Sequence, residues 1–102
     1  MTVPVPEISE VVEKQPKVVE EPPYRVIIHN DDITPMNFVI YVLQYIFMLA
    51  GPRAAQVMFT AHIHGSAYVD SLPKMEAQRR IHTAHVTARL AGYPLLFTLE
   101  RG

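Results

Sequence analysis

Residues 24–36 decide the fold, and they read YRVIIHNDDITPM. The first six, Tyr24 to His29, are rich in β-branched side chains, which is typical of a strand. Residues 30–34 are mostly polar and predict a loop. Thr34 is placed to cap a helix, and Pro35 suits a first helical position. The stretch therefore predicts a strand, a loop and the start of a helix.

Apolar side chains at helical spacing predict three helices along the chain. We expect the first over residues 35–48, the second over residues 52–63 and the third from Pro73 to Leu90. Gly65 and Gly92 follow the second and third helices, where glycine commonly ends a helix. The side chains expected to face the core are Val39, Val42, Leu43, Ile46 and Phe47, then Ala54, Val57, Met58 and Ala61, then Ile81, Ala84 and Ala88.

Two further strands complete the pattern. Residues 67–69 predict a short second strand, and the alternation over residues 95–99 predicts a closing one. The element order is βααβαβ. This order predicts an α+β fold, a small two-layer sandwich in which a three-stranded antiparallel sheet carries three helices on one face.

The composition changes sharply near residue 23. Residues 1–23 are rich in Pro, Val and Glu without apolar periodicity, which predicts a flexible N-terminal extension before one core domain over residues 24–102. Residues 1–22 hold five acids and two lysines, a net charge of −3, whereas the remainder holds seven basic and five acidic residues, a net of +2. The extension is either an inert leader or a segment that another machine can grasp.

The composition also excludes several classes of protein. Neither part is basic enough for a nucleic-acid partner, whose binding depends on neutralising phosphates. The absence of cysteine excludes disulfides and thiolate nucleophiles, and it fits a reducing compartment. The longest apolar stretch, residues 38–51, is too short to cross a bilayer, and the N-terminus lacks a signal-peptide pattern. We therefore expect a cytoplasmic protein that has no membrane partner.

Hydrogen-bond acceptors gather in the first loop at Asn30, Asp31 and Asp32. Two carboxylates beside an amide suit a cation with several donors, and an α-ammonium group has three. The same residues also suit a turn, a helix cap and the helix dipole. The loop alone leaves both interpretations open.

A histidine joins this acceptor cluster from the second helix. His62 follows Met58 by four residues and Ala61 by one, so the three lie on adjoining parts of one helix face. Beside the two aspartates, His62 can orient a bound chain terminus. His64 completes a His-x-His pair, but residues two apart on a helix point in different directions, and no third metal ligand is suitably spaced.

A small hydrolase or metal protein built on Asp31, Asp32, His62 and His64 is the alternative from another functional class. The sequence has no serine in a nucleophile-elbow pattern and no glycine loop that cradles phosphate. We therefore expect no enzymatic activity, no cofactor and no metal.

Four motifs now stand in order along the chain. They are NDDxTPMxFV at residues 30–39, AxQxM at residues 54–58, His62, and PLxxTLE at residues 94–100. Together they resemble the ClpS adaptors, and the resemblance runs without gaps from Tyr24 to Glu100. The first motif combined with the last is highly specific.

The resemblance implies an adaptor function. ClpS proteins bind substrates whose N-terminal residue is Leu, Phe, Tyr or Trp, an N-degron, and deliver them to a Clp AAA+ unfoldase, ClpA or ClpC, for degradation by ClpP. We expect such an adaptor here, acting as a monomer. The alternative within the same fold is a domain that docks on the chaperone and alters its substrate choice without delivering N-degrons.

The resemblance also implies roles for individual residues. The N-terminal amine would be held by Asn30, Asp31 and His62. The side-chain pocket, with Met36 as its gate, would be lined by Asp32, Thr34, Met36, Val39, Met58, Ala61 and Leu95. The contact with the unfoldase would involve Met75, Gln78 and Arg80 on the third helix.

Three positions depart from the family pattern. Ala61 stands where a larger β-branched aliphatic is usual, which predicts a roomier pocket tilted toward aromatic N-termini. Met75 and Gln78 stand where acids are common and Arg80 where a lysine is, so the unfoldase contact is either lost or matched by a changed partner. Asp70 stands where glycine is usual, and the sequence offers no reason for it.

Overall fold

The computed structural model describes residues 22–102, and its elements follow the order expected from the sequence. They are β1 (Pro23–His29), α2 (Met36–Tyr45), α3 (Gly51–His64), β2 (Ser66–Pro73), α4 (Lys74–Leu90) and β3 (Leu96–Arg101). The flexible extension predicted for residues 1–23 lies outside the described residues, except for Pro22 and Pro23. Over residues 22–102, each helix falls short of the length and apolar character that a bilayer crossing needs.

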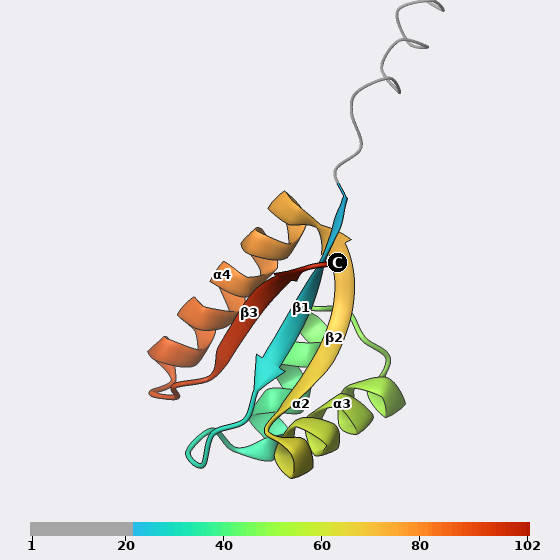
Figure 1. The fold of residues 1–102 in the computed structure, drawn as a ribbon. Coiled ribbons are helices and arrows are strands. Elements are labelled where there is room, and N and C mark those ends of the chain that lie inside the picture. The colour runs from blue at the N-terminus through green and yellow to red at the C-terminus, as the bar shows by residue number, and fades with distance from the viewer. Residues whose placement is uncertain (1–21) are drawn as a thin grey trace, which may run out of the picture.

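The strand β1 is the centre of a three-stranded sheet with the order β2-β1-β3, and it runs antiparallel to both neighbours. Figure 1 shows the three helices behind this sheet, with α4 running along β3 and α3 lying below β2. The helix α4 packs on all three strands, and α3 packs on β2 and α2. The predicted α+β sandwich is confirmed, including its element order and its antiparallel sheet.

The core lies between the sheet and the helices. Val26 and Ile28 point into it from β1 and are almost fully buried. Phe97 on β3 faces the same way, and its ring centroid lies 4.7 Å from that of Phe47. Most side chains predicted to face the core are buried, whereas Ile46 and Ile81 are only partly buried against it.

The first helix is shorter than predicted at both ends. Pro35 is its N-cap residue and Thr34 caps nothing, because the Thr34 hydroxyl donates to the Asp31 carboxylate at 2.8 Å instead. At the other end α2 stops at Tyr45 rather than at residue 48, although the apolar period continues. Past Tyr45 the hydrogen bonds widen, with the N–H of Phe47 reaching the carbonyl of Val42. Met48 then adopts a positive φ of 63°, in the left-handed region, so the helix does not reach residue 48.

The second strand is longer than the predicted residues 67–69. It extends to Pro73, which pairs with Pro23, so α4 begins one residue later than expected, at Lys74. The register shifts where Val26 faces Asp70 and Ile27 faces Tyr68, which leaves Val69 as an extra residue, a β-bulge. At this bulge Arg53 of α3 donates to the Val69 carbonyl at 3.0 Å. The alternation of buried and exposed side chains is interrupted at a bulge, so the sequence pattern did not predict the part of β2 that follows Val69.

A histidine joins α4 to the edge strand β3. Nε2 of His85 accepts the backbone N–H of Phe97 at 3.0 Å, so this nitrogen carries no proton in the folded chain. Burial lowers the pKa of His85, and the positive charges of Arg89 and His82 lower it further. The hydrogen bond therefore depends on a neutral imidazole.

We predict that acid weakens the fold through His85. In the unfolded chain a histidine takes up its proton near pH 6.5, whereas the folded chain resists protonation, so the stability that His85 contributes is complete above that pH. It is lost as the pH falls through about 6.5 toward the lower pKa of the folded state. Urea unfolding measured from pH 7.5 to pH 5 should show a falling free energy of unfolding.

The matched variants for this prediction are His85→Gln and His64→Gln. A glutamine at residue 85 keeps an acceptor at the position of Nε2 but does not titrate, so the slope between pH 7.5 and pH 5 should flatten. His64 is exposed, and its replacement should leave the slope unchanged. Equal slopes in wild type and His85→Gln would contradict this account.

Candidate functional site

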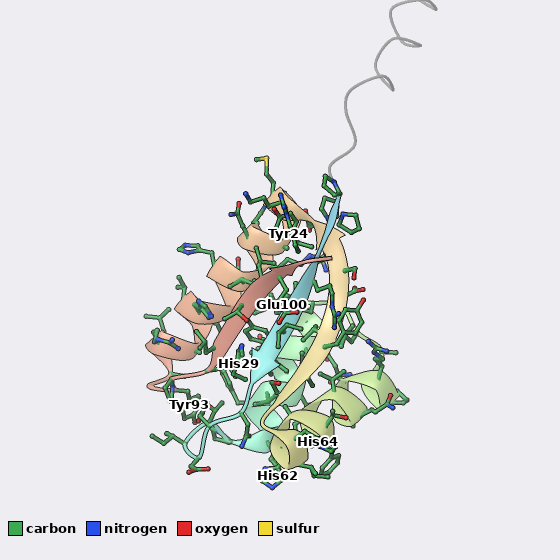
Figure 2. The ribbon with its side chains drawn as sticks, in the orientation of Figure 1. Tyr24, His29, His62, His64, Tyr93 and Glu100 are labelled. Atoms are coloured by element: carbon green, nitrogen blue, oxygen red, sulfur yellow. The ribbon has the colours of Figure 1, made fainter. Side chains whose placement is uncertain are left out.

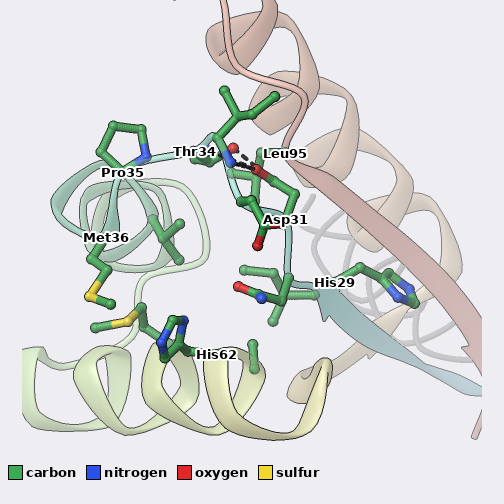
Figure 3. Close-up of a pocket in the computed structure, with 14 residues that line it drawn as sticks. His29, Asp31, Thr34, Pro35, Met36, His62 and Leu95 are labelled. Carbon is green, nitrogen blue, oxygen red and sulfur yellow. Dashed lines mark hydrogen bonds between the residues drawn. The ribbon is translucent and has the colours of Figure 1, made fainter.

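A cavity of about 300 Å³ opens at the end of β1, between the β1–α2 loop, α2, α3 and the residue before β3. Figure 3 shows these elements enclosing it from three sides. All ten residues that the family resemblance assigned to the amine and side-chain subsites line this cavity. The full lining is Ile28, His29, Asn30, Asp31, Asp32, Ile33, Thr34, Pro35, Met36, Val39, Met58, Ala61, His62 and Leu95.

One side of the cavity is apolar and belongs to the core. Val39 of α2, Met58 and Ala61 of α3, and Leu95 from the α4–β3 loop are all buried, and all belong to the core cluster. Three of these residues lie on helices and Leu95 lies on the loop before β3, so the wall is built from separate parts of the chain. An apolar group of a ligand that packs against this wall would be removed from water.

The opposite side is polar and is organised by Asp31. One carboxylate oxygen accepts the backbone N–H groups of Ile33 at 2.8 Å and Thr34 at 2.6 Å, and the other accepts the Thr34 hydroxyl at 2.8 Å. Figure 3 shows this bonding at the top of the cavity, with the Asp31 side chain leaning into it.

These contacts also keep the Asp31 carboxylate charged. Partial burial by itself raises the pKa of Asp31, but the N–H groups of Thr34 and Ile33, the Thr34 hydroxyl and the positive charge of Arg89 together bring it below its usual value. The rim of the cavity therefore holds a full negative charge at neutral pH.

The polar loop is tied to α3 through the backbone. The N–H of Asn30 donates to the carbonyl of Gly65 at 2.9 Å. Gly65 ends α3 with a φ of +93°, a conformation that favours glycine. Gly65 therefore both ends α3 and holds the polar loop next to the end of that helix.

Met36 and His62 stand at the mouth of the cavity. Met36 begins α2 and remains 44% exposed, and His62 lies in the last turn of α3 and is exposed. Figure 3 shows the Met36 thioether reaching across toward the His62 side of α3. A flexible thioether and an imidazole therefore border the opening.

Four lining residues were not predicted: Ile28, His29, Ile33 and Pro35. They fill the gaps in the strand-loop-helix segment of residues 28–36, so chain continuity was the signal that could have found them. His29 contributes little with its side chain, because its ring points away from the cavity in Figure 3 and its Nε2 lies 2.8 Å from the Thr98 hydroxyl.

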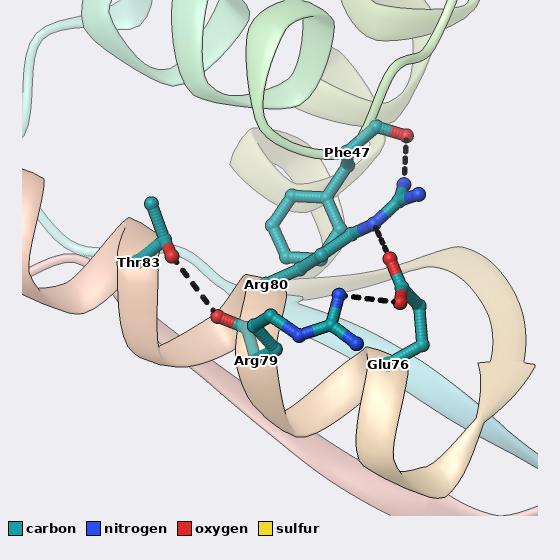
Figure 4. A network of polar contacts seen from close by, with 5 residues as sticks. All are labelled: Phe47, Glu76, Arg79, Arg80 and Thr83. Carbon is teal, nitrogen blue, oxygen red and sulfur yellow. Dashed lines mark hydrogen bonds and ion pairs between the residues drawn. The ribbon is translucent and has the colours of Figure 1, made fainter.

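The predicted unfoldase contact lies outside this lining, on the first turns of α4. Met75 and Gln78 are exposed there. Arg80 is partly buried and engaged within the fold: its Nε lies 2.7 Å from Glu76, and its Nη1 lies 3.3 Å from the Phe47 carbonyl (Figure 4). The hydrogen bond from Arg80 contributes most to lowering the pKa of Glu76. Arg80 therefore has an internal role in joining α4 to the segment after α2.

A metal site would need a cluster of ligands. Within residues 22–102, no three His, Asp or Glu side chains lie close enough to share a metal ion. Figure 2 shows His62 and His64 near the end of α3, both on the surface.

Comparison with known proteins defines the class. A family model described as "ATP-dependent Clp protease adaptor protein ClpS" matches residues 19–98. By class the chain is an adaptor of the Clp protease. Its relatives form a family of adaptors rather than of catalysts. It belongs to the ClpS family.

Individual relatives agree with this assignment. The chain is 39% identical over 88 residues to the ATP-dependent Clp protease adapter protein ClpS of Methylococcus capsulatus, covering 86% of this chain and 83% of that protein. It is 42% identical over 90 residues to the same adapter of Serratia proteamaculans, covering 87% and 85%.

A solved structure is also similar, that of Agrobacterium tumefaciens ClpS2 bound to L-phenylalaninamide. It matches with a TM-score of 0.77 and 36% identity, over 81% of this chain and all of that one.

Proposed function

We propose that this adaptor binds proteins by their free N-terminus when the first residue is Leu, Phe, Tyr or Trp, and delivers them to a Clp AAA+ unfoldase, ClpA or ClpC, for degradation by ClpP. The observation that carries the proposal is the pairing of a charged acceptor rim with a buried apolar wall in one small cavity. The ligand of the Agrobacterium relative supports it, because L-phenylalaninamide combines a free α-amino group with an aromatic side chain.

The size of the cavity supports a single side chain as the ligand. Pockets for drug-sized molecules span roughly 300–1,000 Å³, and this one, at about 300 Å³, lies at the lower limit. Burying a Leu or Phe side chain contributes roughly 1.5–3 kcal/mol. Met36 and Met58 suit a pocket that accepts both branched and aromatic shapes, since the thioether is flexible and polarisable.

The rim supports recognition of a chain end. Asn30, Asp31 and His62 are the proposed partners of the α-ammonium group and the first peptide unit. A carboxylate offers about four acceptor positions, and three are used within the loop, so Asp31 retains one for a ligand. An internal residue of a protein has no such cation, and it would leave the Asp31 acceptor unpaired.

The remaining steps of the proposed role concern location and delivery. We propose that the adaptor acts in the cytoplasm as a monomer, without a cofactor, and that residues 1–23 take part in handing the substrate to the unfoldase. Met75 and Gln78 are exposed and available for the unfoldase contact, whereas Arg80 would have to release its bonds to Glu76 and Phe47 to join them.

Blocking the terminal amine should strongly weaken recognition. A peptide beginning with free Phe should lose about 10–100-fold in affinity when its amine is acetylated, because hydrogen bonds to a charged group contribute about 1.5–3 kcal/mol. Fluorescence anisotropy with a labelled peptide measures this directly. Amidation of the distant C-terminus is the control and should change nothing. An acetylated peptide that binds as well as the free one would refute recognition of the chain end.

Two neighbouring histidines provide a matched pair of variants. His62→Ala should weaken binding of the Phe peptide about tenfold, the loss of one charge-assisted hydrogen bond, whereas His64→Ala, exposed and outside the cavity lining, should bind as wild type does. If wild type fails to bind any such peptide, or if both variants bind it unchanged, the chaperone-docking modulator becomes the better description of the protein.

The small side chain of Ala61 should favour aromatic N-termini. Wild type should bind Phe- and Trp-initiated peptides at least as tightly as a Leu-initiated one. Ala61→Val should weaken Phe and Trp binding about tenfold, since overfilling a packed site costs about 1–3 kcal/mol, and should spare the smaller Leu. Ala55→Val, on the same helix but outside the lining, is the control. A clear wild-type preference for Leu would show that the pocket is not enlarged.

A further inference from the structure

The α4–β3 loop reaches the cavity through one residue. Leu95 is 1% exposed and forms part of the apolar wall, yet it lies outside any helix or strand, between the end of α4 at Leu90 and the start of β3 at Leu96. The other apolar wall residues, Val39, Met58 and Ala61, are held by helices. The position of Leu95 in this wall therefore depends on whatever fixes the loop.

One guanidinium binds the loop at two carbonyls. Nη1 of Arg89, in the last turn of α4, donates to the carbonyl of Tyr93 at 2.8 Å and to that of Leu95 at 2.9 Å. Hydrogen bonds from a charged donor are roughly twice as strong as neutral ones. Resting on the proposed function, we propose that Arg89, although outside the cavity lining, is a positioning residue for the side-chain pocket.

Capping of α4 does not explain these contacts. A cation near a helix C-terminus often serves the last carbonyls of the helix. Here backbone N–H groups already bind those carbonyls. The N–H of Ala91 donates to the carbonyls of Thr87 and Ala88. The N–H of Gly92 donates to the carbonyl of Arg89, and the N–H of Tyr93 donates to that of Ala88. The Arg89 side chain extends beyond the helix and binds only carbonyls of the loop.

The loop is also anchored on its other side. The ring of Tyr93 meets that of Phe38 on α2 edge-on, with centroids 4.8 Å apart. The guanidinium and this aromatic contact together hold the backbone of residues 93–95 between α4 and α2. Removing the guanidinium leaves the ring contact in place but frees the carbonyl of Leu95 itself.

The charge of Arg89 also acts on the opposite side of the cavity. It helps to keep the pKa of the Asp31 carboxylate below its usual value. Arg89 therefore serves the apolar wall by geometry and the polar rim by charge. The two effects can be separated, because lysine retains the charge but carries it on a flexible stem and lacks the rigid guanidinium that holds its N–H groups toward the loop carbonyls.

The experiment compares wild type with Arg89→Gln, Arg89→Lys and Arg79→Gln, using peptides that begin with Phe or Ala. Arg79 lies on the same helix in an exposed pair with Glu76, so its variant controls for loss of a positive charge on α4. The ratio of the two affinities reports the side-chain pocket alone, and a general loss of folded protein does not move it.

We expect Arg89→Gln to lower the Phe-to-Ala affinity ratio about tenfold, since a wall displaced by a fraction of an ångström loses much of its contact energy. In the same variant, acidification should begin to weaken peptide binding at a higher pH than in wild type, because Arg89 no longer helps to lower the pKa of Asp31. Arg89→Lys should lower the ratio but keep the wild-type pH profile, and Arg79→Gln should keep both.

An unchanged ratio in a folded Arg89→Gln protein would overturn the proposal. So would a loss of affinity that is equal for the two peptides, because it would show a structural effect without positioning of the pocket. A wild type that binds neither peptide would instead refute the proposed function, which keeps the two failures distinct. Amide hydrogen exchange of Tyr93, Leu95 and Leu96, expected to accelerate in Arg89→Gln and Arg89→Lys but not in Arg79→Gln, reports on the loop without any ligand.

Discussion

The site depends on one carboxylate that binds its own loop. Asp31 gathers the N–H groups of Ile33 and Thr34 and the Thr34 hydroxyl, and in doing so it fixes the path from the central strand to the first helix. Thr34 is therefore engaged by Asp31 and does not cap the helix. The same carboxylate carries the negative charge that the rim presents to the cavity. Loop geometry and ligand electrostatics thus rest on a single side chain, so substituting Asp31 changes both at once.

Recognition by charge and shape requires parts from distant regions of the chain. The rim comes from the loop after β1, whereas the apolar wall comes from α2, α3 and the residue before β3. The backbone bond between Asn30 and Gly65 and the two bonds of Arg89 connect these parts. The cavity is accordingly a product of tertiary structure, and no contiguous motif contains it.

The sequence predicted well what short-range physics controls. Alternation in Val26 and Ile28, helical spacing in α3, and the glycine at residue 65 each reflect a local rule, and each element formed as expected. Prediction failed where the backbone breaks the period: the widened turn after Tyr45 that leads to the positive φ of Met48, and the bulge at Val69 in β2. The residues alone indicated the acceptor loop and the His62 face, and the rest of the pocket came from the family resemblance. Arg89 and His85 escaped notice because their partners are backbone groups of the loop and strand that follow α4, and no side-chain pattern reveals these.

The two outer strands of the sheet have a further property. Arg53 occupies the carbonyl of Val69 on β2, and His85 occupies the N–H of Phe97 on β3, so helix side chains take up backbone groups at both borders of the sheet. An incoming polypeptide that sought to extend the sheet would have to displace a guanidinium on one side or an imidazole on the other. This arrangement therefore discourages extended chains from pairing with the sheet at those two positions.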